Sequence, residues 1–94
     1  MSNEISQLTF TTTPEAAASF HDGGVVILHT SQGRLFRSNQ TGASIWRGLE
    51  QKLSVDVIAQ QISGEYQIEL SAAREHTAHF VGQLQRHALV QRGR

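Results

Sequence analysis

The sequence contains no cysteine, a single proline and no excess of charge of either sign. Without cysteine the chain can form no disulfide framework, no thiolate zinc site and no thiol nucleophile. Eight Lys and Arg residues balance eight Asp and Glu residues in a chain of 94, so net charge gives no long-range attraction to phosphate groups. Charge alone therefore predicts binding to neither nucleic acid nor an anionic membrane.

Long apolar segments are also missing. The longest wholly apolar run, residues 25–28, is far too short to cross a bilayer. Residues 1–6 show no basic region followed by an apolar stretch, so we expect no signal peptide and a cytoplasmic location. We expect a flexible N-terminus over residues 1–6, one domain over residues 7–91, and a flexible tail over residues 92–94 with fraying from Gln91.

Strand patterns occupy the first half of the chain. Residues 8–13 alternate apolar and polar side chains, residues 17–21 are a second candidate, and the pattern leaves open which of them is the first strand. Asp-Gly-Gly at residues 22–24 is a hairpin signal because these residues accept positive φ. The β-branched segment 25–29 and the segment 34–38 then complete a small antiparallel meander, with the segment 34–38 at an edge.

In the second half of the chain, the spacing of the apolar residues changes to that of helices. Residues 45–53 place apolar side chains on one face, and residues 55–62 repeat at helical spacing behind Ser54, a suitable N-cap. Gly64 is interpreted as the end of that helix, and Ser71 as the cap of a third helix. The apolar stripe of the third helix consists of Ala73, Thr77, Phe80, Val81, Leu84 and Ala88. An N-terminal three-stranded antiparallel sheet followed by three helices predicts an α+β domain with a winged helix-turn-helix arrangement.

Catalytic motifs are not found in the sequence. HExxH, GxSxG and GxxxxGK[ST] are all lacking. His76 and His79 share a helix face, but a catalytic zinc site usually takes three protein ligands, so we expect no metal and no cofactor. Trp46, spaced with Leu49 and Leu53, is interpreted as a core residue and not as a ligand platform. The sequence thus predicts a protein that is not an enzyme.

Two binding functions stay open on the residues alone. A winged helix could bind DNA, although the third helix carries only Arg74 and Arg86, which is too sparse for a basic recognition face. In the other hypothesis the outer N–H and C=O groups of the edge strand 34–38 take up an extended peptide as an added strand. Arg34 and Arg37 could equally serve to protect that edge from association, as charges do in many sheets. The pattern leaves these last two interpretations near even.

A series of residues marks the junction between this strand and the first helix: Phe36, Asn39, Thr41, Gly42, Ala43, Ile45 and Trp46. This series resembles the junction of the PqqD-like family of leader-peptide-binding domains. The family pattern is an aromatic, any residue, Leu-Asn, two residues later Gly-Ala, then Ile-Trp. Downstream matches are Ser54, Val55, Ile58, Ala59, Tyr66, Phe80, Leu84, Leu89 and Val90. The resemblance covers about residues 14–91 as an ordered series of motifs.

Two positions depart from the family pattern. Ser38 stands where the family usually has Leu before the Asn, which bears on the packing of the edge strand. Ala88 stands where the family usually has Gly before Leu-Val. If Ala88 adopts the positive φ of that glycine, we expect a strain on the order of 1 kcal/mol.

The resemblance implies a recognition element for ribosomally made, post-translationally modified peptides, without catalytic activity or a cofactor of its own. The leader of the precursor peptide would lie antiparallel to the strand 34–38, in the cleft with the third helix. The domain would present the leader to a modifying enzyme such as a leader protease, a cyclase or a radical enzyme. The implied peptide-binding residues are Arg34, Leu35, Phe36, Arg37 and Ser38 on the strand and Ala73, His76, Phe80 and Leu84 on the helix.

Stand-alone members of the family resemble two kinds of protein. One is the chaperone subunit of quinone-cofactor synthesis, and the other is the free leader-binding subunit of lasso-peptide clusters. By this resemblance we expect a monomer or weak dimer with a peptide and an enzyme as its partners.

Overall fold

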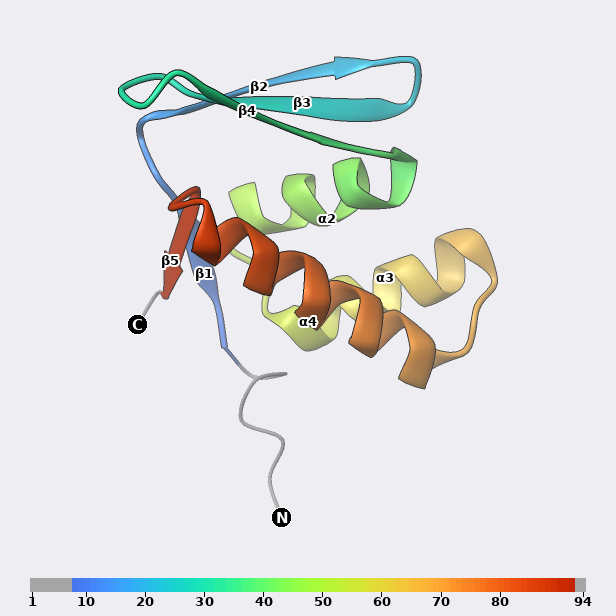
Figure 1. The fold of residues 1–94 in the computed structure, drawn as a ribbon. Helices are drawn as coiled ribbons and strands as arrows, with labels where there is room; N and C mark the ends of the chain where they lie inside the picture. The colour runs from blue at the N-terminus through green and yellow to red at the C-terminus, as the bar shows by residue number, and fades with distance from the viewer. Residues whose placement is uncertain (1–7, 93–94) are drawn as a thin grey trace.

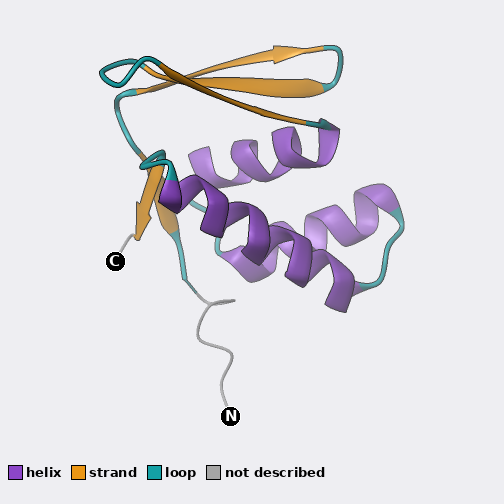
Figure 2. Cartoon of the chain, in the orientation of Figure 1, coloured by secondary structure: helices purple, strands orange, loops and turns teal. Residues whose placement is uncertain are grey.

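The chain forms two small antiparallel sheets and a set of three helices (Figure 1). The computed structural model describes residues 8–92. In chain order the elements are β1 (Phe10–Thr12), β2 (Ala16–His21), β3 (Gly24–His29), β4 (Arg34–Ser38), α2 (Gln40–Glu50), α3 (Val55–Tyr66), α4 (Leu70–Arg86) and β5 (Val90–Arg92). In Figure 2 the sheet of β2, β3 and β4 forms one layer, α2 lies beneath it, and α3 and α4 lie below α2. The predicted α+β class is confirmed.

The larger sheet is a meander in which β3 lies between β2 and β4, and both pairings are antiparallel. Asp22 and Gly23 alone connect β2 to β3, with φ values of 51° and 80°. Positive φ at both residues is what a type I′ turn requires, and the twist of that turn matches the twist of the flanking strands. The hairpin signal of the sequence is therefore confirmed.

The number of strands differs from the predicted three. Both candidate first strands form, but in different sheets: β1 pairs with β5, whereas β2 pairs with β3. β5 includes Gln91 and Arg92, which the sequence assigns to a loose tail. Phe10 pairs with Arg92 across almost the whole chain, and no local pattern predicts so distant a contact. The expectations for residues 1–6 and for residues 93 and 94 fall outside the described residues.

Side chains cap the first two helices, and the predicted cap at Ser54 is confirmed. The Asn39 side chain accepts a hydrogen bond from the Gly42 N–H at 3.0 Å and begins α2. The Ser54 hydroxyl accepts from the Val57 N–H at 3.2 Å and begins α3. Each satisfies a backbone donor that the first turn of a helix leaves without a partner.

Two other helix boundaries differ from the prediction. α3 continues past Gly64 and ends at Gln67, which adopts a left-handed φ of 57°. The Ser63 hydroxyl donates to the carbonyl oxygen of Ile68 at 2.7 Å and so fixes the chain just beyond the helix. α4 begins one residue before Ser71 and has no side-chain cap. Contacts made beyond the helix end, and not the isolated Gly and Ser signals, set these boundaries.

The core lies between the larger sheet and the helices. Trp46 of α2 is only 1% exposed, and its indole N–H donates to Glu50 at 2.9 Å, so its predicted place in the core is confirmed. The other large, fully buried side chains are Phe10, Ile27, Ile45, Leu49, Ile58, Ile62, Leu84, Leu89, Val25, Val55 and Val81. Because β3 and α2 both contribute to this core, they hold the larger sheet in a fixed position over the helices.

The link from α4 to β5 passes through Ala88, whose φ is 58°. The Ala88 and Leu89 N–H groups donate to the carbonyl oxygens of Gln85 and Leu84 at 3.0 Å and 2.9 Å, which closes the C-terminal end of α4. The left-handed region costs a residue with a Cβ about 1–2 kcal/mol. Ala88 therefore adopts the positive φ for which strain is expected at this departure from the family pattern.

Candidate functional site

β4 is an edge strand of the larger sheet, because β3 is its partner on one side and no other strand of the described chain pairs with it. The direction of its backbone groups follows from the β2–β3 hairpin. In a two-residue hairpin the flanking residues, here His21 and Gly24, form a hydrogen-bonded pair. Thr30 N–H donates to the Glu15 carbonyl oxygen at 2.8 Å, which extends the same alternation to the other end of the strands.

This alternation fixes which groups of β4 are free. The even-numbered residues of β3 face β2, so Val25, Ile27 and His29 direct their backbone groups toward β4. Their partners there are Ser38, Phe36 and Arg34. Hydrogen-bonded and outward-facing residues alternate along an edge strand. The N–H and C=O groups of Leu35 and Arg37 consequently face outward from the sheet. The sequence left open which set faces outward, and the register settles it.

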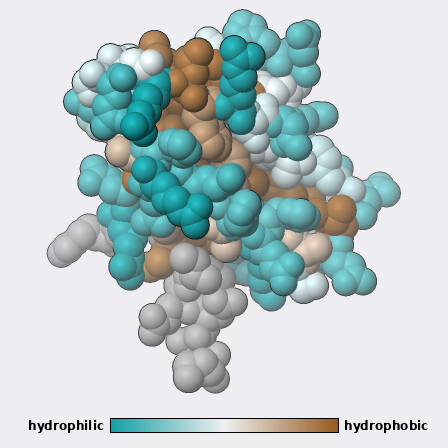
Figure 3. Space-filling view, viewed as in Figure 1, coloured by the Kyte–Doolittle hydropathy of each residue, from teal (hydrophilic) through white to brown (hydrophobic). Residues whose placement is uncertain are grey.

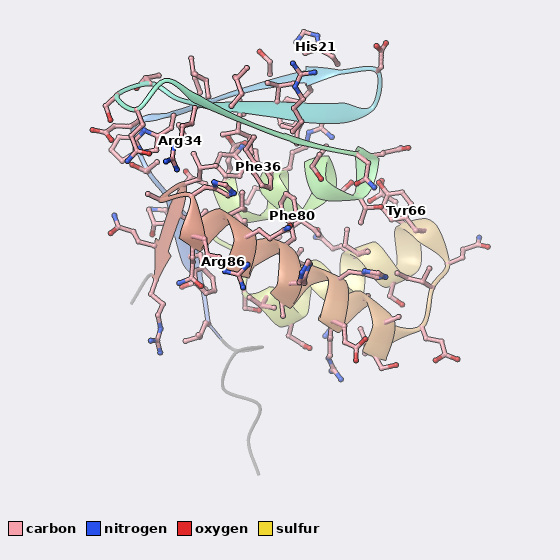
Figure 4. The ribbon with its side chains drawn as sticks, viewed as in Figure 1. His21, Arg34, Phe36, Tyr66, Phe80 and Arg86 are labelled. Carbon is pink, nitrogen blue, oxygen red and sulfur yellow. The ribbon has the colours of Figure 1, made fainter. Side chains whose placement is uncertain are left out.

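The side chains of β4 alternate between two environments. Leu35 is 58% exposed on the outer face of the sheet. Phe36 is half-buried on the opposite face, where its ring lies edge-on to Phe80 of α4 with centroids 5.7 Å apart. The His87 ring lies 5.2 Å from the Phe36 ring on the same side. Figure 4 shows Phe36 and Phe80 directed into the space between β4 and α4. This ring contact, named the Phe36–Phe80 floor, joins the edge strand to the last helix, and the space along it between β4 and α4 is named the cleft.

A cavity of about 350 Å³ continues this cleft beyond the end of β4. Its wall is formed by Ser38, Asn39, Thr41, Gly42, Ile45, Tyr66, Ile68, His76, His79, Phe80 and Gln83. The Tyr66 hydroxyl donates to the Gln40 carbonyl oxygen at 3.2 Å and lies 2.9 Å from the Ser44 hydroxyl, which positions the ring at the α3 side of the cavity. In Figure 3 brown apolar residues lie among teal polar residues on this face of the molecule.

Gly42 is needed for the close approach of β4, α2 and α4. A Cβ at this position would lie 2.5 Å from the Cβ of Ser38 and 3.0 Å from a ring carbon of Phe80. The first distance is far inside van der Waals contact, so the strand end, the first turn of α2 and Phe80 could not all keep their places. The glycine of the Gly-Ala pair thus shapes the cavity wall.

The structure brings only part of the predicted helix residues to the cleft. His76 and Phe80 line the cavity together with Ser38. Ala73 and Leu84 are each 0% exposed and are absent from that wall, because they lie on the side of α4 that packs into the core. A peptide in the cleft can contact neither of them without a rearrangement of the core.

Eight lining residues were missing from the predicted set, and four of them, Asn39, Thr41, Gly42 and Ile45, come from the junction of β4 with α2 and from α2 itself. His79 and Gln83 follow His76 at positions i+3 and i+7, so helical spacing from His76 would have found them. Tyr66 and Ile68 come from the end of α3 and the loop after it. Only the packing of α3 against α4 places these two residues at the cavity.

The described residues show neither a catalytic cluster of charged side chains at the cavity nor a metal site. The Arg74 guanidinium donates to Asp56 at 2.8 Å and lowers the pKa of that carboxyl, and neither residue lines the cavity. Within residues 8–92 no three His, Cys, Asp or Glu side chains are grouped to hold a metal ion. None of the helices in the same range has the length and apolar character needed to span a bilayer.

Comparison with known proteins gives a family and a fold. Residues 24–90 match the family of coenzyme PQQ synthesis protein D (PqqD). The structure of TbiB1 in complex with the TbiA(beta) leader peptide has a TM-score of 0.80 and 23% sequence identity, over 86% of this chain and 94% of that one. The structure of lasso peptide synthetase B1 complexed with the leader peptide has a TM-score of 0.79 and 28% identity, over 87% of this chain and 96% of that one. No curated protein matches the sequence.

Proposed function

Because this chain belongs to the PqqD family, we propose that it binds the leader segment of a ribosomally made precursor peptide and presents it to a modifying or processing enzyme. The leader adds to β4 as an extra strand and lies in the cleft between β4 and α4. The observation that carries the proposal is the free edge of β4, with the outward backbone groups of Leu35 and Arg37 directly beside the Phe36–Phe80 floor. The two solved proteins of the same fold, each complexed with a leader peptide, support it.

The backbone of β4 supplies register and part of the affinity. Leu35 and Arg37 together offer two N–H donors and two C=O acceptors to an added strand. At a net value of about 0.5–1.5 kcal/mol for each hydrogen bond, four bonds contribute about 2–6 kcal/mol. Association itself costs at least about 4 kcal/mol in lost translational and rotational freedom. Backbone pairing alone is therefore too weak, and the side chains of the leader have to contribute.

The cleft offers those side chains two apolar contacts. Side chains of an added strand alternate between its two faces, so every second residue of the leader points toward α4. One of these residues rests on the rings of Phe36 and Phe80, and a neighbour on the same face enters the cavity beside Ser38 and His76. Each buried apolar side chain adds about 1.5–3 kcal/mol. Backbone pairing and side-chain burial together exceed the free-energy cost of association, so the leader can bind.

The rest of the proposal concerns the type of protein. We take residues 7–91 as one binding domain of the winged helix-turn-helix type, in which α4 faces a peptide. The domain acts as a monomer or weak dimer in the cytoplasm, without a catalytic centre of its own. The chemistry belongs to the partner enzyme, whether that is a leader protease, a cyclase or a radical enzyme.

The direct test is a titration of the 15N-labelled chain with the leader of its candidate precursor, followed by amide chemical shifts. We expect saturable shifts at Leu35 and Arg37, at Phe80, and along the cavity-facing side of α4. A leader with the same composition in scrambled order is the matched control. Saturable binding with shifts confined to α3 and the outer sheet face would contradict the proposal.

A further inference from the structure

Arginine side chains lie on both sides of the cleft, although the whole chain is neutral. On β4, Arg34 shares the face of Phe36 toward α4, whereas Arg37 shares the outer face of the sheet with Leu35. Both arginines are exposed, and β4 contains no acidic residue. Across the cleft, the C-terminal end of α4 contributes the exposed Arg86. Figure 4 shows Arg34 on the sheet side and Arg86 on the helix side of the same end of the cleft. This end of the cleft thus carries an arginine on each side.

These arginines lack acidic partners within the described chain. The ion pairs of residues 8–92 join Arg74 to Asp56 at 2.8 Å and His29 to Glu15 at 3.6 Å. Glu15 lies near the Arg34 end of β4, because its partner His29 pairs with Arg34 in the sheet, but its carboxylate forms no ion pair with a cleft arginine. No carboxylate of the described residues pairs with the arginines of the cleft. Like charges without counter-charges repel one another, so a ligand that carries carboxylates gains from contact with them.

The cavity at the other end of the cleft lacks carboxylates. His76 and His79 form part of its wall, and no Asp or Glu does. The single acidic residue of α4, Glu75, is exposed and is not part of the wall. The polar side chains of the cavity wall are therefore amide, hydroxyl and imidazole groups.

Protection of a free sheet edge explains only part of this pattern. Charges on an edge strand prevent association with other strands, and Arg34 and Arg37 are placed to do so. Arg86 belongs to α4, however, and contributes nothing to the edge of the sheet. Edge protection therefore does not account for an arginine on the helix side of the cleft, and a ligand of opposite charge does.

We infer that the peptide held in this cleft is acidic, with Asp or Glu at two positions three residues apart; the inference rests on the function proposed above. Residues opposite each other in a sheet share a face. A carboxylate opposite Arg34 would lie on the helix side, between Arg34 and Arg86, and a carboxylate opposite Arg37 would lie on the outer face. The spacing of three follows from the positions of the two arginines, and guanidinium groups are the side chains best suited to carboxylates.

The test is a selection of binders from a library of random dodecapeptides displayed on their encoding RNA, with the full chain as bait. We expect Asp or Glu at two positions three apart, and a shift to Lys or Arg at those positions with the bait Arg34→Glu/Arg37→Glu. The bait Lys52→Glu/Arg92→Glu carries the same change in net charge on exposed residues away from the cleft, and it should still select acidic peptides. A selected peptide made synthetically should bind about fivefold more weakly when salt rises from about 0.1 M to about 1 M, as for two exposed ion pairs.

The outcomes separate the two proposals. Peptides that require the free edge, as judged by loss of binding to Leu35→Pro, but that carry no acidic enrichment would overturn the acidic specificity and leave leader binding intact. Acidic enrichment that persists unchanged with the Arg34→Glu/Arg37→Glu bait would overturn it as well. If neither the library nor the leader yields a ligand that depends on the edge, the proposed function fails and the inference fails with it.

Discussion

Proline substitutions in β4 distinguish strand addition from binding on the helices alone. Proline removes a backbone donor, and its ring cannot be accommodated in a paired ladder. At Leu35 the N–H faces outward and the side chain is 58% exposed, so Leu35→Pro should cost the free fold little. A bound peptide would lose one hydrogen bond and keep a buried carbonyl without a donor, at a combined cost of about 2–4 kcal/mol. We expect affinity for the leader to fall at least about thirtyfold.

At Phe36 the same substitution acts on the fold. The Phe36 backbone faces Ile27, which is 0% exposed, and its ring packs against Phe80. Loss of the ladder bond and an unsatisfied buried carbonyl cost about 2–4 kcal/mol. Loss of the ring adds about 1.5–3 kcal/mol, which brings the total to about 4–7 kcal/mol. That is a large part of the about 5–15 kcal/mol by which small domains are stable. We therefore expect Phe36→Pro to be largely unfolded or to melt far below the wild type.

The assays are thermal unfolding by circular dichroism and titration calorimetry with the leader. Leu35→Ala and Phe36→Ala are the matched controls, because they remove the side chain and keep the N–H. Wild-type affinity in a well-folded Leu35→Pro would refute strand addition at β4, and the site would have to be sought on the helices. An unfolded Leu35→Pro beside a folded Phe36→Pro would show that the alternation derived from the hairpin is wrong.

Three further predictions concern the core, the link after α4 and nucleic acid. Trp46→Ala should destabilise the fold by about 3–5 kcal/mol in denaturant unfolding, because the indole is 1% exposed; a folded mutant that has lost only its ligand would place Trp46 in the site. Ala88→Gly should raise stability by about 0.5–1 kcal/mol, because relief of the left-handed φ exceeds the added backbone entropy; unchanged or lower stability would show that Ala88 is not strained. Duplex DNA should not be retained at physiological salt in a mobility-shift assay, because α4 carries only two arginines; tight, sequence-dependent retention would favour the DNA-binding alternative.

The parts of the fold that the sequence predicts are those encoded by neighbouring residues. The Asp22–Gly23 turn and the cap at Ser54 each satisfy a local backbone requirement, and each is found where the pattern places it. The pairing of β1 with β5 has no such local cause. It depends on the packed core, which brings the two ends of the described chain together. A contact between residues so far apart leaves no periodic pattern in the sequence.

Which backbone groups of β4 face outward is only partly encoded by neighbouring residues. A strictly two-residue turn makes His21 and Gly24 a hydrogen-bonded pair and fixes the alternation through β3 to β4. The sequence Asp-Gly-Gly does not say whether the loop holds two or three residues, and a shift of one residue reverses the set that faces outward. The φ values of Asp22 and Gly23 remove that ambiguity.

Helix α4 shows why the candidate site was only partly predicted. Its apolar stripe is easy to recognise, and the stripe includes Ala73, Leu84 and Phe80, which are all buried. Of these only Phe80 lies at the boundary between the core and the cavity, so it alone belongs to both. The other α4 residues that line the cavity, among them His76 and His79, lie on the next strip of the helix. In a sequence, polar side chains at these positions cannot be told from ordinary surface residues.

This division of α4 also bears on how the cleft binds. One side of the helix is fixed in the core through Ala73 and Leu84, so the side facing β4 is held in place before any peptide arrives. β4 is fixed in the same way through β3 and through the Phe36–Phe80 contact. A rigid cleft loses little conformational freedom on binding, and an extended peptide bears most of the ordering cost. Under the proposed function, affinity then depends on what the peptide contributes: backbone groups for Leu35 and Arg37, apolar side chains for the floor and the cavity, and, if the inferred acidic specificity holds, carboxylates for the arginines.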